Sequence, residues 1–433
     1  MSERAEVFEI TQIGPESTRG TAVPATRRLI GTSIRPSIQT EVQTYRAKGV
    51  RVGSVGVLNK EWVEADIEQD PALYSGETTY LIGGLLGPPS ISNPSSGVYL
   101  GEWDPLTFTG LNPKTYTVES GSWIRAGEFP YGLVTGLEMT GTRDGVSLSG
   151  TMIGQEYSDN ITLTAGTAEV QTLTASGTVS GGTYTLQFMG ETTSSLAYNA
   201  NTATIQAALD ALVNVASGDI TVGGGTLPGT PATFTFGGQY ASADVPLIVV
   251  NGASLTGSTP AYTMTQTTAG AALTEIAIQP ISGKDWDFYI DDTGAGVGTT
   301  KLTRVFEWSW GITGMYGPVW PGNTSEPSWA AHVDLAPDTS FSFTVEADST
   351  GMAELADLRA GTKRFVRIKC TGPTLGASTY LMQFDFCVHL TGISEFKDQD
   401  GVYAVTYEGE IQYDKTWGKW ISWDLRNETS AIS

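Results

Sequence analysis

Cysteine and histidine are scarce in this sequence. Only two cysteines, Cys370 and Cys387, occur among 433 residues, which is too few for a secreted disulfide scaffold, so a reducing compartment is expected. The two histidines, His332 and His389, lie far apart and have no spacing typical of metal ligands. We therefore expect no metal site and no cofactor.

Basic residues are also few. The chain has 24 Lys and Arg against 46 Asp and Glu, a formal net charge of -22. Such a protein cannot bind DNA by neutralising its phosphates, and it would repel DNA. A second interpretation is that the acidity only keeps the protein soluble. No run approaches the roughly 18 apolar residues that a membrane span needs, so we expect no membrane association and synthesis in the cytoplasm.

Catalytic motifs are missing as well. The sequence contains no Gly-x-Ser-x-Gly elbow and no phosphate-binding loop. We therefore expect that the protein is not an enzyme. The alternative is a β-sandwich glycan hydrolase, which needs two positioned carboxylates; the sequence has many acids and does not single out a pair.

Glycine, serine and threonine are abundant. The 52 glycines suit tight turns, and threonine suits strands. Helical patterns are few and short. The composition predicts a mainly β fold with antiparallel sheets.

A separate module is expected at residues 166–270. This stretch has five acids and no Lys or Arg, and such a composition break is typical of a domain boundary. Strands are expected at 170–177, 183–189, 232–236 and 245–250. One helix is expected at Thr202–Val215, capped by Asn201 or Thr202. Its apolar stripe consists of Ile205, Ala208, Leu209, Leu212 and Val213.

The stretches on either side of this module resemble each other. Val63-Glu64-Ala65-Asp66 recurs as Val345-Glu346-Ala347-Asp348, and Val134-Thr135-Gly136-Leu137 recurs as Leu390-Thr391-Gly392-Ile393. After each second motif the same interval leads to an Asp-Gly turn, at Asp144-Gly145 and at Asp400-Gly401, which predicts a hairpin. A third pair, Thr26-Arg27-Arg28-Leu29 and Thr300-Lys301-Leu302, opens each stretch. Three pairs in one order indicate an internal duplication.

The duplication predicts three domains. Residues 1–165 and 271–433 would each form an antiparallel β-sandwich or partial barrel with one short amphipathic helix, at 75–86 and at 351–360. The module at 166–270 would be inserted between them as a β-rich domain with one helix.

Two segments carry a resemblance to a known family. They are Ile13–Leu29, with the sequence IGPESTRGTAVPATRRL, and the run from Asp287-Phe288-Tyr289-Ile290-Asp291-Asp292 to Gly298-Thr299-Thr300-Lys301-Leu302-Thr303-Arg304. Together with the inserted module, they resemble the tail tube (major tail) proteins of siphophages. The module itself is similar to β-rich insertions in phage virion proteins. The alternative is a surface-exposed adhesin or decoration protein of a virion, which the module alone would suit.

The resemblance implies a structural role in a virus particle. Tube domains of this family form rings of six that stack into a β-lined channel for DNA. Two tube domains in one chain would make each ring a homotrimer with approximate sixfold symmetry, and a homohexamer is the alternative. The resemblance also implies a tape measure protein and a tail terminator as partners, and DNA passing through the lumen without specific binding.

Four acids are candidates for the channel wall. In the strands around them, Val63 and Ala65 would share one face, as would Val345 and Ala347. The candidate lumen-facing acids Glu64, Asp66, Glu346 and Asp348 would point to the opposite face, whether that face is the lumen or the exterior.

Two loops are candidates for contacts between stacked rings. The segment 33–52 carries Arg35, Arg46, Lys48 and Arg51 in an otherwise acidic chain. It is either a solvated hairpin or a ring-stacking loop that meets an acidic face. The corresponding aromatic segment, 308–329, carries Trp310, Tyr316 and Trp320. Buried core is possible there, but its prolines argue against one regular strand and favour an interface loop.

Overall fold

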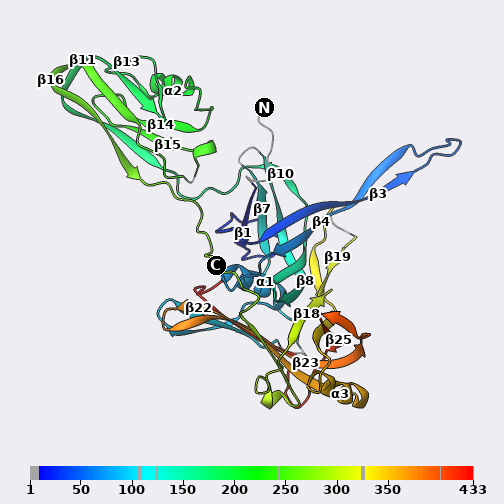
Figure 1. Ribbon diagram of the computed structural model, residues 1–433. Helices are drawn as coiled ribbons and strands as arrows, with labels where there is room; N and C mark the ends of the chain where they lie inside the picture. Colours follow the sequence, from blue (N-terminus) through cyan, green and yellow to red (C-terminus); the bar gives the residue numbers. More distant parts are fainter. Residues whose placement is uncertain are drawn as a thin grey trace. The chain divides into compact units, whose positions relative to one another are not determined.

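The computed structural model describes residues 9–105, 109–122, 125–241, 243–322, 327–399 and 401–432 (Figure 1). The chain divides into two compact units. One unit combines residues 1–161 with residues 276–433, and the other is residues 162–275. Antiparallel strands dominate both units, so the predicted mainly β fold is confirmed.

The inserted unit, 162–275, has its own hydrophobic core. Its elements are β11 (Val170–Phe188), β12 (Glu191–Thr192), β13 (Leu196–Ala197), α2 (Thr202–Asp210), β14 (Ile220–Gly224), β15 (Ala232–Phe236), the 3-10 turn η2 (Gly238–Tyr240) and β16 (Val249–Thr268). The two ends of the unit meet, because Thr167 and Ala271 exchange two backbone hydrogen bonds of 2.8 and 2.9 Å. This bridge brings the incoming and outgoing segments together.

Helix α2 begins where the sequence predicted but ends five residues early. The Asn201 side chain accepts a hydrogen bond from the Thr204 amide at 2.8 Å, so the predicted cap is confirmed. Ile205 is buried in the core, whereas Val213 lies beyond the helix and is 87% exposed. The predicted membership of Val213 in the apolar stripe is therefore wrong.

Among its described residues, the first half of the larger unit contains ten strands and one helix. They are β1 (Ile10–Pro15), β2 (Arg27–Leu29), β3 (Ser33–Tyr45), β4 (Val55–Gln69), α1 (Gly76–Leu86), β5 (Ser90–Ser95), β6 (Val98–Trp103), β7 (Tyr116–Gly121), β8 (Ala126–Thr142), β9 (Val146–Gly154) and β10 (Ser158–Ile161). Neighbouring strands pair in the order β3-β4-β9-β8-β7-β1-β2.

The second half also contains ten strands and one helix. They are β17 (Trp286–Asp291), η3 (Gly294–Gly296), β18 (Val305–Thr313), β19 (Tyr316–Val319), β20 (Ala331–Asp334), β21 (Asp338–Glu346), η4 (Gly351–Ala353), α3 (Glu354–Ala360), β22 (Lys363–Leu375), β23 (Ser378–Ile393), β24 (Lys397–Gln399), β25 (Val402–Ile411) and β26 (Ile421–Asn427). The pairing order is β18-β21-β25-β23-β22-β17.

The two halves follow the same path of strand pairings. In each half one long strand takes part in two sheets. The first part of β8 pairs with β7 and its second part with β9. In the same way, the first part of β23 pairs with β22 and its second part with β25. The same β-bulge interrupts both strands, at Thr135 and at Thr391, immediately before Gly136 and Gly392. An isolated bridge between Tyr289 and Lys301 takes the place of the β1–β2 pairing. The shared path supports an internal duplication.

The glycine after each bulge fixes which positions correspond. Thr151 lies opposite the first glycine and Glu408 opposite the second. On the next strand, Asp66 lies opposite Thr151 and Ser342 lies opposite Glu408. Asp66 therefore corresponds to Ser342, and the predicted match of Asp66 with Asp348 is wrong by six residues. A short motif that alternates apolar and acidic residues fits a strand in every register that differs by two residues, which explains the error.

The halves are joined rather than separate. Strand β18 pairs with β8, so the two inner sheets become one, and β26 pairs with β6 as a second link between the halves. A single hydrophobic core runs through both halves. Each predicted flanking domain is thus one part of a common compact unit.

Both predicted short helices are present in the larger unit, but α1 does not have the predicted amphipathic character. All eleven residues of α1 are buried, because the helix is enclosed by the core. Helix α3 ends at Gly361, whose left-handed backbone (φ of 67°) closes the helix. Of the two predicted Asp-Gly turns, the one at Asp144 joins β8 to β9. Asp400 lies outside the described residues.

Candidate functional site

One face of the joined inner sheet carries a group of exposed acidic side chains. The sheet runs β3-β4-β9-β8-β18-β21-β25-β23, with four strands from each half. Alternate side chains, such as Val63, Met139, Trp308, Phe343 and Tyr407, are buried in the core. The intervening side chains point to the other face. We call this second face the acidic face.

The acidic face combines carboxylates with hydroxyls. Its charged members are Glu64, Asp66, Glu68, Glu138, Glu307, Glu408, Glu410 and Arg35, and its small polar members include Ser147, Ser149, Thr151, Ser309, Ser340, Ser342, Thr344 and Thr406. All seven acids are exposed. Acidic and small polar side chains therefore predominate on this surface, and Arg35 is the one base among these members.

Cross-strand pairing keeps these acids apart. Glu138 lies between Ser149 and Gly311, and Glu408 lies between Ser342 and Gly392. None of the seven acids lies directly opposite another in these strand pairs. This arrangement avoids the destabilisation that two like charges cause when they face each other across a strand pair. Hydroxyls bond across the strands, with 2.8 Å between Ser309 and Ser342 and 2.8 Å between Thr344 and Thr406.

Three of the four predicted wall acids, Glu64, Asp66 and Glu346, point to the acidic side of their strands. Glu64 and Asp66 alternate with buried Val63 and Ala65, as the sequence predicted. Glu346, the last residue of β21, forms an ion pair with Arg304.

Asp348 has a different role from the predicted one. It lies beyond the strand and accepts hydrogen bonds from the Thr350 and Gly351 amides at 2.9 and 2.8 Å. These bonds, above all the one from Gly351, lower the pKa of the Asp348 carboxyl. Asp348 thus stabilises the turn before α3 rather than lining the sheet face.

Five acids of this face were not predicted from the sequence. They are Glu68, Glu138, Glu307, Glu408 and Glu410. The signal was present: each lies in a segment where buried and exposed residues alternate, as in Phe-Glu-Trp-Ser-Trp at 306–310. The repeated motif drew attention to only two of the strands.

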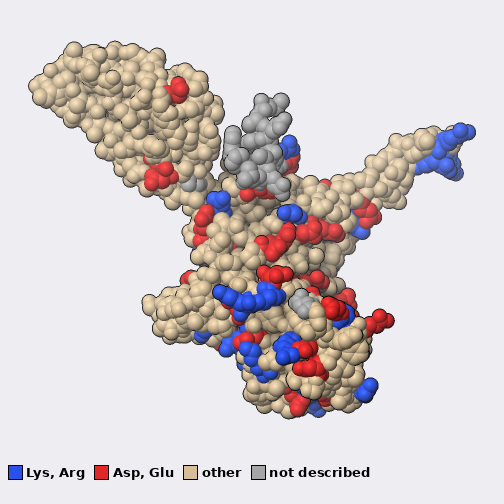
Figure 2. Space-filling model, viewed as in Figure 1, with Lys and Arg blue, Asp and Glu red and all other residues tan. Residues whose placement is uncertain are grey.

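A long two-stranded arm projects from the inner sheet. Strands β3 and β4 pair beyond the level of β9 and form the hairpin on the right of Figure 1. At its tip are Arg46, Lys48 and Arg51, all exposed and without an ion pair among the described residues. Figure 2 shows only basic side chains at this tip, while acidic ones gather on the body near the base of the arm.

Arg35 does not belong to the arm tip. It lies at the base of β3, on the acidic face, 3.7 Å from the Glu68 carboxylate. The predicted stacking cluster therefore consists of three residues at the tip and one residue of the sheet face. The exposed tip leaves both interpretations of the hairpin open, since solvated and docked tips are both exposed in a single chain.

The aromatic segment of the second half is largely core. Trp310 is buried in β18 and packs on Trp423 with 4.9 Å between ring centroids. The buried Tyr316 hydroxyl donates a hydrogen bond to the Leu85 carbonyl at 2.5 Å. The predicted interface role of Trp310 and Tyr316 is therefore wrong, because their rings fill the interior. Strands β19 and β20 fold this segment back as a short hairpin.

Trp320 packs against the base of the arm. Its ring lies edge-on to Trp62, 5.6 Å between centroids, and the Lys60 ammonium lies 5.2 Å from its ring centre. The Glu61 amide also donates to the Pro327 carbonyl at 2.9 Å. Trp320 thus supports the arm of its own chain.

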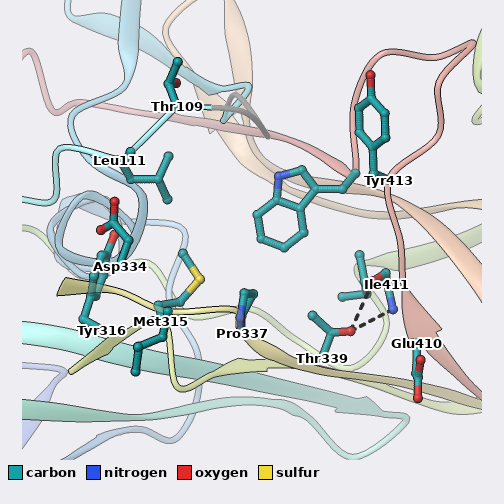
Figure 3. A pocket seen from close by; sticks show the side chains of 13 residues that line it. Thr109, Leu111, Met315, Tyr316, Asp334, Pro337, Thr339, Glu410, Ile411 and Tyr413 are labelled. Carbon is teal, nitrogen blue, oxygen red and sulfur yellow. Dashed lines mark hydrogen bonds between the residues drawn. The ribbon is translucent and has the colours of Figure 1, made fainter.

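A recess beside the β19–β20 hairpin has a volume of about 570 Å³. Met315, Leu335, Ile411 and Trp420 give it apolar walls. In Figure 3 Asp334 and Glu410 lie on opposite sides of it, and Thr339 bonds to the Ile411 backbone. The recess lies at the end of β21 and β25 and carries no group that identifies a ligand.

Comparison with known proteins adds no family. The sequence matches no protein-family model and no curated protein. No three Cys, His, Asp or Glu side chains gather as metal ligands in the ranges that the structure covers. Within those same ranges, no helix has both the length and the apolar character that a membrane crossing requires.

Proposed function

We propose that this chain is the tail tube subunit of a long-tailed bacterial virus, a structural protein whose copies close into rings that stack into a channel for DNA. The observation that carries the proposal is the joined inner sheet. It is made from two copies of one strand path, it is acidic on one face, and both of its edges are open in the described part of the chain.

The acidic face suits the wall of a DNA channel. Phosphates bind proteins chiefly through Lys and Arg, and Arg35, which lies among these acids, is next to Glu68. The surrounding carboxylates repel DNA over about 8–10 Å at physiological salt. The remaining side chains are small and polar. DNA would pass such a wall without being held.

Closing the sheet explains the number of copies. Each chain supplies four inner strands from each half, so three chains supply six equivalent sets of four. A closed sheet of 24 strands is wider than the barrels of 16–18 strands that already leave an aqueous channel. The ring would have threefold symmetry and approximate sixfold symmetry; six chains are the alternative.

The proposal places the protein in the virion tail after synthesis in the host cytoplasm. Its partners would be other copies of itself and, through the resemblance, a tape measure protein and a tail terminator. It requires no cofactor, no membrane and no catalysis.

Negative-stain electron microscopy of the purified protein tests the proposal. Tubes of uniform width with threefold averaged rings are expected. Only monodisperse globules, over a range of protein concentrations and salt, would contradict a tube subunit. Rings of six equivalent chains would support the tube and replace the threefold count.

Charge reversal tests the role of the acidic face. Virus particles that carry Glu64→Lys, Glu138→Lys and Glu408→Lys should still assemble tails but release DNA more slowly, because the lysines bind phosphates. The matched control reverses three exposed acids of the inserted unit, Glu191, Asp210 and Asp244. Equal release rates in both variants would remove the acidic face from the channel wall.

A further inference from the structure

The joined inner sheet ends in two open edges. Strand β3 pairs only with β4 in the part of the chain described by the structure. At the opposite end, the segment of β23 after Leu390 pairs only with β25, within the same limits. Open edges expose unpaired backbone donors and acceptors, which invite pairing with another strand.

The chain itself shows how two such edges combine. Within one molecule, β8 of the first half pairs with β18 of the second half, and Leu137 lies opposite Ile312. Because the halves share one strand path, β23 corresponds to β8 and β3 corresponds to β18. The open edge on β23 therefore corresponds to the β8 edge, and the open edge on β3 corresponds to the β18 edge. The β8 and β18 edges already pair with each other inside the molecule.

The correspondence can be stated residue by residue. Leu137 follows the glycine after the first bulge, as Ile393 follows the glycine after the second. Arg35 lies opposite Asp66, as Ser309 lies opposite Ser342. Arg35 thus corresponds to Ser309, and counting three residues further, Ile38 corresponds to Ile312.

We infer that β3 of one copy pairs antiparallel with the end of β23 of the next copy, with Ile38 opposite Ile393 and Ser37 opposite Ser394. The contact is head-to-tail, so it continues from copy to copy until the ring closes. With the internal β8–β18 seam, every half would meet its neighbour through the same ladder. The inference rests on the proposed function only for the closed ring, since the strand pairing is a property of the two edges.

The side chains at this seam fit the inference. Ile38 is 51% exposed in the single chain although it points to the core side of the sheet, next to buried Val63. Pairing with the next copy would cover it. Pro36 has no amide hydrogen to donate and would lie opposite Glu395, where β23 has already ended. The ladder would therefore run from Ser37 toward the arm.

Cysteine cross-linking tests the register. The variant with Ser37→Cys and Ser394→Cys should form disulfides between copies on mild oxidation, because opposed residues in such a ladder have Cβ atoms about 5 Å apart. The native Cys370 and Cys387 are 0% exposed and should not interfere. Non-reducing electrophoresis should show covalent dimers and trimers and no larger species. Ile38→Cys with Ile393→Cys is a second pair, since one of two adjacent pairs has the closer side chains.

The control pair is Glu41→Cys with Ser394→Cys, displaced by four residues or about 13 Å along the strand. It should not cross-link within a ring, because a disulfide requires Cα atoms within about 7 Å. Tryptophan fluorescence and thermal unfolding like those of the unmodified chain establish that each variant is folded.

The outcomes separate the seam from the tube. Specific cross-links that stop at three copies without tubes would support the seam and contradict the proposed function. Tubes in which neither register pair cross-links would overturn the seam and leave the function standing. Preferred linkage of the control pair would overturn the register, and covalent species up to six copies would overturn the threefold closure.

Discussion

Buried carboxylates organise the N-terminal part of the chain, residue by residue. Glu16 accepts hydrogen bonds from the Gly20 and Tyr131 amides at 2.8 and 2.7 Å. Glu77, in the first turn of α1, accepts from the Ile30 amide at 2.8 Å and from the Thr32 hydroxyl at 2.6 Å. These acids hold irregular segments onto the core, because bonds to charged acceptors are stronger than neutral ones.

Replacing Glu77 should therefore destabilise the larger unit. Glu77→Ala leaves the part-buried amides of Ile30 and Gly31 and the buried Thr32 hydroxyl without their acceptor, and we expect a loss of about 2–4 kcal/mol in the free energy of unfolding. Urea unfolding followed by tryptophan fluorescence measures this unit alone, because all 11 tryptophans lie outside residues 162–275. The control, Glu41→Ala, removes only an exposed ion pair with Lys60 and should cost about 1 kcal/mol or less. Equal effects would refute the role of Glu77.

Asp424 should make the stability of the larger unit depend on pH. Burial and the neighbouring Asp385 raise the pKa of its carboxyl to about 6. The folded state therefore holds its proton more tightly than the unfolded state, whose pKa is near 3.8. Stability from this group is fully present below about pH 4 and falls as the pH rises through about 6.

The isosteric Asp424→Asn variant isolates this effect. Relative to the native chain, it should gain about 1–2 kcal/mol between pH 4 and pH 7, a figure reduced for the partial exposure of the group. In the native chain, the Gln383 side-chain amide donates a hydrogen bond to the Asp424 carboxylate at 2.9 Å. The amide oxygen of the variant can accept the same bond. Parallel stability curves for both proteins over this range would disprove the assignment.

At the scale of the residue, alternation was the reliable signal. It placed Glu64 and Asp66 on the exposed side of β4 because each lies between buried neighbours. It could not tell a half-buried tryptophan from a buried one in 308–329: Trp310 alternates with polar residues and is core, whereas Trp320 follows the end of β19 and is half-buried. Tertiary packing decides between them, and the local sequence does not contain it.

At the scale of the element, the hairpin at Asp144 and the cap of α2 could be predicted because short-range chemistry determines both. Strand β11 could not: two predicted strands, 170–177 and 183–189, form one strand of 19 residues that bends at glycines. The complete burial of helix α1 could not be predicted either. It depends on Gly83 and Gly84, which pack closely against other segments, and on polar residues that bond inside the core.

The arm is the element with the clearest expected phenotype. Replacing the three tip cations, Arg46, Lys48 and Arg51, by alanine should leave folding unchanged but shorten tubes to single rings or short stacks, because the tip would lose its attraction to an acidic neighbour. Electron microscopy at several salt concentrations measures tube length; high salt should imitate the substitution in the native protein.

A matched control for the arm removes three other exposed cations, Lys284, Arg359 and Lys415. It changes the net charge equally and should leave tube length as in the native chain. Equal shortening by both variants would attribute the effect to net charge rather than to the arm.

At the scale of the whole molecule, the inserted unit should be dispensable for assembly. It has a separate core, and its two ends are closed by the Thr167–Ala271 bridge. Joining Ile161 to Ile276 by a short Gly-Ser linker should preserve tryptophan fluorescence, unfolding of the larger unit and tube formation. A folded deletion variant that never forms tubes would show that the inserted unit takes part in assembly.

The β8–β18 ladder has a kinetic consequence. In a ring of three chains, three of the six seams between halves lie within single polypeptides, so they form during folding and do not depend on encounters between molecules. The rate of forming a first ring would then vary with at most the third power of the chain concentration, whereas a ring of six separate single-half subunits could depend on up to the sixth. Nucleation of this lower order remains fast when chains are dilute, and the duplicated polypeptide would therefore begin its assembly at concentrations where unlinked halves stay dispersed.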